Sequence, residues 1–600
     1  MWFKFCPYTL LLIIIFSVGF SYTIFINYES LFTMMLLEAD PGNLAWGVMK
    51  LFDEPVYSQY NYWFSSSYGW FFNDINFLVV LILKVVGKLL GFYEPPIFGL
   101  ANEAPIFNIA IKSVNFIFAL ISLLLFFKVA DRLFANQKIA LIASIFFMFI
   151  PWSAFYTYTL HPDSAGMALT LLAILLLLKF IQQEPKISYF FIASTSLLLA
   201  VLCKPYFGFF AIPVFLLFFI TYCHKNQLKY SEFFFSQRLL KTLILFLFIS
   251  IITIITVHPY SLFYIVERPM WLFMPWIYLK SAQVTAIPIH ESFYNWALLY
   301  LQEPLVFINL LLLILLTIIS ICPIYLVFKE KFAAISYLWV SSILFCGMYL
   351  LLVLFGNRMA VSLKYLYPIA PLLILNVVAV ILFIWKHLDV LFPNKIFYAK
   401  AVFAILLGGY GLSSFLGNTL ETVNMLLYKA LYKQSTLYQA NNFIINELMN
   451  NKKFTSNKVW FDISRMPFPP VAPLSQLPKA TWVSHLGIQN RNYLVKQEVL
   501  YVELNDNLLK NIQPEFIILA EWRRDMTEDY YYTSKVNYRK YLREYNYKLI
   551  KEIPGTQYQF DPIFTYFLKD INTFEDTKQL VTVLRNPNEL IGSTILFYQR

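Results

Sequence analysis

The stretch "HPDSAGMALTLLAILLLL", from His161 to Leu178, places a histidine, a proline and an aspartate directly before a long apolar run. Apolar runs of about 20 residues match the hydrocarbon thickness of a bilayer, so this one predicts a membrane-spanning helix. A carboxylate such as Asp163 at the boundary of a bilayer is costly to keep, so its side chain is a helix cap, part of a site, or both. The rest of the chain indicates which side of the membrane it faces.

Composition sets the class of protein. Of the 600 residues, 59% are hydrophobic and 19% are aromatic, and the mean hydropathy is +0.61. A water-soluble core does not need that much apolar surface, so we predict a polytopic α-helical membrane protein. The net charge of +11 arises mostly in short loops between apolar runs. That pattern indicates membrane topology rather than nucleic-acid binding.

Apolar runs recur along the first two thirds of the chain. We predict eleven transmembrane spans, near residues 7–27, 106–127, 138–152, 165–180, 188–203, 207–222, 241–257, 305–327, 333–355, 365–385 and 400–417. A further run at 75–92 is apolar enough to span. However, Lys84 and Lys88 interrupt it four residues apart, as on an amphipathic helix that lies at the membrane interface.

The basic residues decide the topology. If the N-terminus is cytoplasmic and 75–92 does not cross, basic residues concentrate in the cytoplasmic loops, whereas the opposite loop 28–75 has one lysine and six acidic residues. This obeys the positive-inside rule, and a spanning 75–92 would invert every later loop. We therefore expect the first loop, Asp163 and the C-terminus outside. The Ile-, Phe-, Asn- and Lys-rich usage is typical of a bacterium, so the expected location is the inner (plasma) membrane.

The tail has a different character. From about residue 421 the chain is polar, and short β-type runs recur in it: "KVWFDIS", "EFIILAEW", "YKLIKEI" and "STILFYQR". A helical pattern, "YQANNFIINELMNNK", precedes the first of them. We predict a transmembrane catalytic domain over 1–420, with a juxtamembrane first outer loop at 28–105, and a soluble extracytoplasmic α/β domain over 421–600.

Two acids in the first outer loop are candidate site residues. Glu38 and Asp40 lie in "LLEADPGNLAWGVMKLFDEP", ahead of a helix-compatible segment that Asp40 could simply cap. The loop continues into "YNYWFSSSYGWFFNDINF", whose aromatic and hydroxyl side chains suit sugar stacking. Asp163 is predicted at the same membrane face, and it too could cap its helix. His161 and Asp163 could ligate a divalent metal, but their spacing alone does not indicate one.

Three cations on the same face break the positive-inside pattern. Lys204 lies in the short turn "LCKPYFGFFAIP", and Arg358 and Lys364 lie in "FGNRMAVSLKYLYPIAP". Each taken alone could be a side chain that extends to the interface from a helix end. Together with the carboxylates they favour an anion site, such as one for a lipid phosphate.

In their order along the chain, these elements resemble the membrane glycosyltransferases of the GT-C type. The nearest groups are the protein O-mannosyltransferases and the lipid A aminoarabinose transferases (glycosyltransferase family 39-like). The ordered elements are "EADPGNLAWG", "YGWFFNDINFLVVLILKVVG", "ADRLFANQK", "HPDSAGMALTLLAILL", "CKPYFGFFAIP", "KYLYPIAPLLIL" and the soluble tail. The resemblance covers most of the chain, and the ordered set is more specific than any single motif.

The resemblance implies a sugar donor carried on a polyprenyl phosphate, with a first-loop aspartate as the catalytic base. It also implies that Lys204, Arg358, Lys364 and Tyr365 hold the lipid phosphate. Two departures affect this assignment. The acidic pair that is often adjacent in the family is separated here by Ala39, which leaves both Glu38 and Asp40 as candidate bases. The family's usual Arg-Tyr reads Lys364-Tyr365.

The chemistry agrees with that set of residues. An acceptor hydroxyl must lose a proton as it attacks the anomeric carbon, which requires a base, and the phosphate leaving group needs only fixed cations. A single displacement would invert the anomeric carbon. The alternatives are a polysaccharide polymerase or ligase and a lipid-linked glycan transporter. The sugar and the acceptor, whether glycan, lipid or protein, remain open.

Overall fold

A computed structural model describes seven stretches of the first half of the chain: 6–25, 70–91, 105–149, 157, 161–183, 186–227 and 237–257. It also describes scattered positions between 367 and 412 and between 436 and 447. In the tail it describes 458–462, 481–484, 499–501, 506–521, 537–555, 590 and 594–600. The chain forms two compact units. One comprises Met1–Ile24, Tyr68–Ile75 and Ser113–Thr422, and the other comprises Phe25–Ser67, Asn76–Lys112 and Val423–Arg600.

The helices of the first half lie on the predicted apolar runs. They are α1 (Pro7–Phe20) with η1 (Ser21–Phe25), α5 (Trp70–Leu89), α7 (Pro105–Phe134), α8 (Gln137–Met148), α10 (Asp163–Gln182), α11 (Ile187–Cys203), η2 (Pro205–Phe210), α12 (Ala211–Lys225) and α14 (Gln237–Val257). Among the described residues, Pro7–Phe25, Ile106–Phe134 and Asp163–Gln182 are long and apolar enough to cross a membrane. The predicted spans from 305 to 355 lie outside the described residues.

Some helix bounds differ from the sequence prediction. The run predicted at 75–92 forms α5, which begins at Trp70, whereas α7 continues to Phe134 and α8 ends at Met148. The apolar runs mark only where lipid-compatible side chains lie. A helix extends past them for as long as its backbone hydrogen bonds continue.

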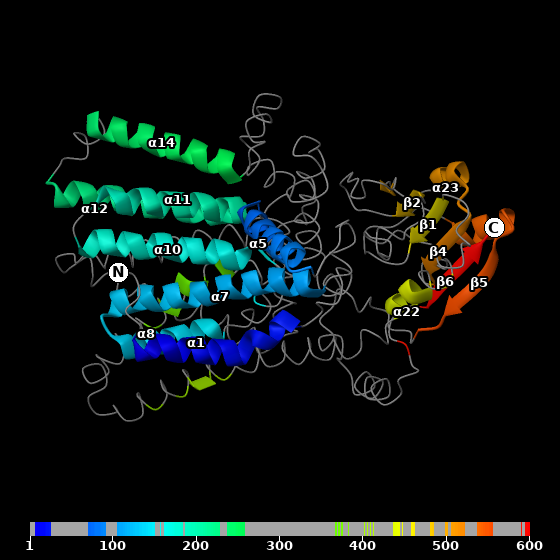
Figure 1. Ribbon diagram of the computed structural model, residues 1–600, viewed down its shortest axis with the longest axis horizontal. Helices are drawn as coiled ribbons and strands as arrows, with labels where there is room; N and C mark the ends of the chain where they lie inside the picture. Colours follow the sequence, from blue (N-terminus) through cyan, green and yellow to red (C-terminus); the bar gives the residue numbers. More distant parts are fainter. Residues whose placement is uncertain are drawn as a thin grey trace. The chain divides into compact units, whose positions relative to one another are not determined.

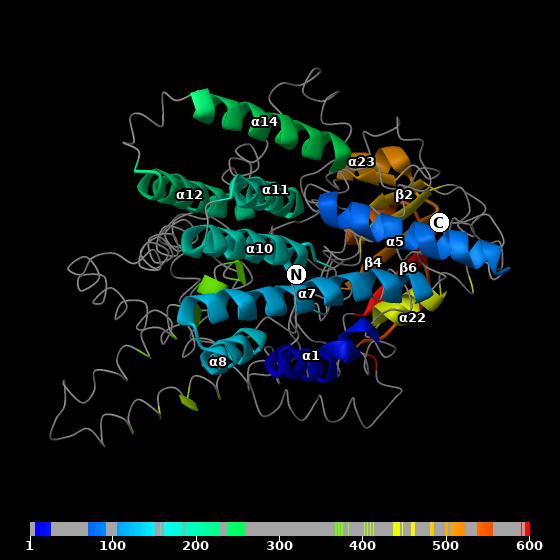
Figure 2. The same cartoon turned by 60° about the vertical axis from the view of Figure 1, so that its left-hand side comes forward.

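Helix α10 is the central element of the first unit. It packs against α11, α12 and η2, and Figures 1 and 2 show it between α7 on one side and α11 with α12 on the other. Most of its side chains are buried, from Asp163 to Ile181, as expected of a helix that is apolar on all faces. The Ser122 hydroxyl of α7 donates to the Ser164 carbonyl at 3.0 Å, which ties α7 to the first turn of α10.

The second unit contains a six-stranded mixed sheet in the order β3-β2-β1-β4-β6-β5. The strands are β1 (Lys458–Asp462), β2 (Thr481–Ser484), β3 (Val499–Tyr501), β4 (Phe516–Ala520), β5 (Lys548–Ile553) and β6 (Ile595–Gln599). Strands β1 to β4 pair in parallel, whereas β6 is antiparallel to both β4 and β5. The four predicted β-type runs form β1, β4, β5 and β6. The predicted helical pattern overlaps α22 (Thr436–Phe443), which starts two residues before the pattern.

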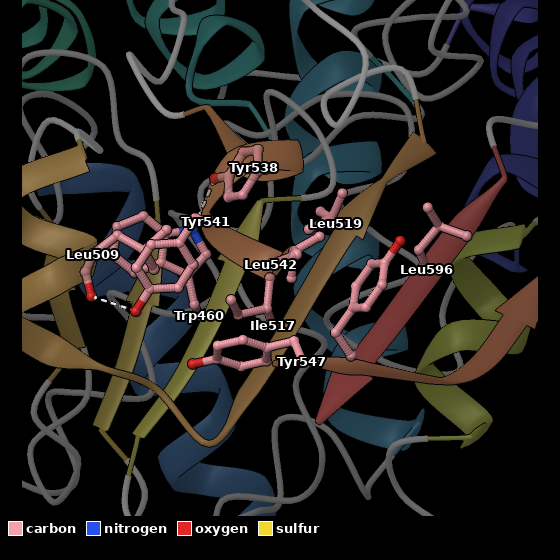
Figure 3. Close-up of a cluster of buried hydrophobic side chains, with 10 residues drawn as sticks. Trp460, Leu509, Ile517, Leu519, Tyr538, Tyr541, Leu542, Tyr547 and Leu596 are labelled. Carbon is pink, nitrogen blue, oxygen red and sulfur yellow. Dashed lines mark hydrogen bonds between the residues drawn. The ribbon is translucent and has the colours of Figure 1, made fainter. Parts of the chain in front are cut away.

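Side chains cover both faces of this sheet. On one face, α25 (Tyr538–Glu544) and α23 (Asp506–Ile512) contribute to a core with residues of β1, β4 and β6 (Figure 3). The Trp460 indole N–H donates to the Tyr538 hydroxyl at 2.8 Å inside that core. On β6, Phe597 alternates with the core residues Leu596 and Tyr598 and stacks edge-on against Phe443 of α22, with ring centroids 4.9 Å apart. The sheet is therefore covered by helices on both sides, as its fully buried central strand β4 requires.

Candidate functional site

Asp163 is the first residue of α10, and it does not cap the helix. The N-cap position falls on Pro162, and no side chain supplies a cap hydrogen bond there. The Asp163 side chain is fully buried. A carboxylate in the first turn is favoured by the helix dipole, but the Oδ2 atom of Asp163 is directed to Lys204 and His161.

Lys204 is the main partner of Asp163. Its backbone N–H donates to the Ala200 carbonyl at 2.9 Å and so closes α11, and its carbonyl accepts from Phe207 N–H at 3.1 Å at the start of η2. The Lys204 side chain turns inward, where the ammonium donates to Asp163 Oδ2 at 2.8 Å. Lys204 is only 6% exposed, so this is a buried ion pair.

His161 completes a cluster of three polar side chains. Its ring lies against the same carboxylate, through Nδ1 and Asp163 Oδ2. Its Nε2 is 3.0 Å from the Lys204 ammonium, which can donate to a neutral imidazole nitrogen. Burying two charges costs several kcal/mol per ion before their attraction offsets it. Buried ionisable residues in a membrane protein usually serve a function, so this cluster is a candidate functional site.

The residues of α7, α10 and η2 around the cluster are tightly packed. The Asn115 amide of α7 donates to the Thr157 carbonyl at 3.1 Å. Gly166, in the first turn of α10, lies against the Phe207 ring of η2, which occupies the space that a β-carbon would need. Glycine at this position therefore allows η2 to approach α10 closely, and that approach holds Lys204 next to Asp163.

Tyr367 is a site residue that the sequence analysis missed. It is 3% exposed, interacts electrostatically with Asp163, and stacks on Phe147 with ring centroids 6.5 Å apart. The sequence analysis chose Tyr365 from the same segment. The signal that could have indicated Tyr367 is its place directly before Pro368, at the start of the next apolar run.

The start of α5 also interacts with the end of α11 next to this cluster. The backbone of Phe72 hydrogen-bonds with the Cys203 thiol, and Asp74 and Asp163 both act electrostatically on that thiol. Burial raises the pKa of the Asp74 carboxyl to about 8. The sequence analysis quoted this segment for its aromatic and hydroxyl side chains and as an element of the resemblance, but it did not select Asp74.

The structure thus brings together two of the predicted site residues, Asp163 and Lys204, from the ends of two neighbouring helices. Five others lie outside the described residues: Glu38, Asp40, Arg358, Lys364 and Tyr365. Within the part of the chain that the structure describes, no three His, Cys, Asp or Glu side chains are grouped to hold a metal ion.

Comparison with known proteins gives one family match. Residues 105–263 match the family described as dolichyl-phosphate-mannose-protein mannosyltransferase. The matched segment contains α7 to α14, and so both Asp163 and Lys204. It confirms the predicted resemblance to GT-C type glycosyltransferases. No curated protein matches the chain.

Two solved structures are similar in overall arrangement. Both are of ArnT from Cupriavidus metallidurans, and each is 12% identical in sequence to this chain. The structure bound to undecaprenyl phosphate has a TM-score of 0.45 and covers 86% of this chain and 92% of ArnT. The structure in the apo state has a TM-score of 0.44 and covers 85% of this chain and 93% of the ArnT chain.

Proposed function

We propose that this protein is a glycosyltransferase that moves a sugar from a polyprenyl-phosphate donor to an acceptor hydroxyl at the outer face of a bacterial plasma membrane. The observation that carries the proposal is the buried pair of Lys204 and Asp163, 2.8 Å apart, inside the segment that matches the mannosyltransferase family. A cation held at a helix end by a buried carboxylate is suited to bind an anionic group of a lipid.

In this proposal Lys204 binds the lipid phosphate, and Asp163 positions the Lys204 ammonium group. The ammonium already faces a carboxylate and an imidazole, so its direction is fixed before any donor arrives. As the bond between the sugar and the phosphate breaks, negative charge grows on the phosphate oxygens. A preorganised cation stabilises that charge without reorganisation. Arg358, Lys364 and Tyr365 are proposed to complete the phosphate site.

A first-loop carboxylate acts as the base. Asp40 accepts the proton of the acceptor hydroxyl as the oxygen attacks the anomeric carbon, and Glu38 is the alternative for this role. The phosphate ester leaves as a weakly basic anion and needs no proton. One displacement on the face opposite the phosphate inverts the anomeric carbon. The proposal also places the tail domain, 421–600, on the outer side.

The test is transfer of a radiolabelled sugar from a polyprenyl-phosphate donor by the purified protein, with Asp40→Asn and Glu38→Gln as variants. Loss of a general base costs about 100-fold or more in turnover, so Asp40→Asn should show that loss with donor binding intact. A larger loss in Glu38→Gln would move the base to Glu38. Movement of the intact donor across vesicle membranes without transfer would indicate a transporter instead and would overturn the proposal.

A further inference from the structure

Two consecutive polar residues near the start of α5, Asn73 and Asp74, have no role in the chemistry described above. Asn73 is fully buried, and within the described part of the chain neither its side-chain nitrogen nor its side-chain oxygen has a hydrogen-bond partner. A buried amide left without partners costs about 1–3 kcal/mol per unsatisfied group. Native proteins rarely keep such a group unless a ligand or a bound water satisfies it.

Asp74 follows directly and is half-buried. No salt bridge to it occurs among the described residues. Burial raises the pKa of its carboxyl to about 8, so a large fraction is protonated at neutral pH. A protonated carboxyl both donates and accepts a hydrogen bond, as an amide does. The two residues therefore present donors and acceptors in pairs, which is how vicinal hydroxyl groups are bound.

The position of this part of α5 follows from its contact with α11. Phe72 is fully buried, hydrogen-bonds through its backbone with the Cys203 thiol, and lies with its ring 6.3 Å from that of Phe118. Cys203 is the last residue of α11, and Lys204 comes next. The thiol of Cys203 thus interacts electrostatically with both Asp74 and Asp163.

We propose that Asn73 and Asp74 form a subsite that binds hydroxyl groups of the transferred sugar next to the phosphate site at Lys204. This rests on the proposed function, because the sugar is taken to be linked to the phosphate that Lys204 holds. The subsite adds affinity only for lipids that carry the sugar. Its unsatisfied amide makes the ligand-free protein less stable than it would be with an apolar residue at position 73.

The test uses the full-length protein in detergent with two probes, a polyprenyl phosphate and the same lipid carrying a sugar. In Asn73→Leu, affinity for the sugar-linked lipid should fall by about 10-fold, the scale of one or two lost hydrogen bonds, while affinity for the sugar-free lipid stays unchanged. Asp74→Leu should show the same selective loss, and Asp74→Asn a smaller one. In the absence of lipid, Asn73→Leu should raise the melting temperature.

Asn115→Leu is the matched control for stability. Asn115 is equally buried, but its amide donates to Thr157, so its replacement should lower the melting temperature. A lower melting temperature in Asn73→Leu would overturn the proposal, because the amide would then be paired within the protein. Equal losses for both lipids, or no loss for either, would also overturn the subsite. If the unsubstituted protein binds neither lipid, the proposed function itself fails.

Discussion

The two ends of helix α10 use charged side chains in different ways. At the C-terminal end, the Lys225 ammonium donates to the Phe180 carbonyl at 3.1 Å and to the Gln183 carbonyl, and the Gln182 amide donates to the Arg132 carbonyl at 3.0 Å. These bonds satisfy carbonyls that every helix end leaves without a partner, and a cation there also suits the helix dipole. Helix capping accounts for them fully.

At the N-terminal end, the charges of Asp163 and Lys204 are directed to each other in a buried position and cap nothing. A helix end of this kind would be served as well by a neutral cap at lower desolvation cost. The comparison teaches that position at a helix end does not identify a site. What distinguishes the site is burial of the charge together with a partner from another helix.

The largest expected effect comes from breaking the buried pair. Lys204→Met leaves a buried carboxylate without its lysine, which should lower the free energy of unfolding by about 3–5 kcal/mol. Replacing both partners, as in Asp163→Leu with Lys204→Met, should restore most of that loss but not transfer activity. Chemical denaturation of the single and double variants measures this. Equal stability of all three proteins would show that the pair is solvated and that the contrast between the two helix ends is false.

A smaller effect is expected at Gly166. An added methyl group would meet the Phe207 ring, and such overpacking costs about 1–3 kcal/mol. Gly19→Ala is the matched control, because Gly19 lies in α1 with nothing within 4 Å of the added carbon. Helix propensity alone should stabilise that variant by about 1 kcal/mol. A lower melting temperature in Gly166→Ala together with a higher one in Gly19→Ala supports the close approach of η2 to α10. Equal increases of the melting temperature in both variants would contradict it.

The smallest effect concerns Asp74 and pH. Burial raises the pKa of this carboxyl from its ordinary value of 3.8 to about 8. The folded state therefore favours the protonated form, and the stability this provides is lost as the pH rises through the folded value. Among the described residues, the thiol of Cys203 interacts electrostatically with it. Between about pH 5 and about pH 9 the melting temperature should fall less in Asp74→Asn than in the unsubstituted protein. Parallel pH profiles would mean that the carboxyl is solvated.

The sequence predicted the described helices well, because long apolar runs are the segments that are stable as helices in the hydrocarbon core of a bilayer. From loop charges alone it also predicted that Asp163 and Lys204 lie at one membrane face. It could not predict their contact, because that depends on the close approach of η2 that Gly166 permits. Asn73 and Asp74 were missed because they lie in an aromatic, apolar segment, where hydropathy conceals individual polar residues. Strands β2 and β3 were missed because "TWVS" and "VLY" are too short to show a pattern.

The most direct test of the central claim is the dissociation constant of a radiolabelled polyprenyl-phosphate sugar for two lysine variants. Lys204 and Lys225 lie at opposite ends of α10 and differ in what their ammonium groups bind. Losing a charged hydrogen bond to phosphate should raise the dissociation constant of Lys204→Met by about 10- to 100-fold, while Lys225→Met stays within about twofold of the unsubstituted protein. The same dissociation constant in both variants would contradict the assignment of Lys204 to the donor phosphate.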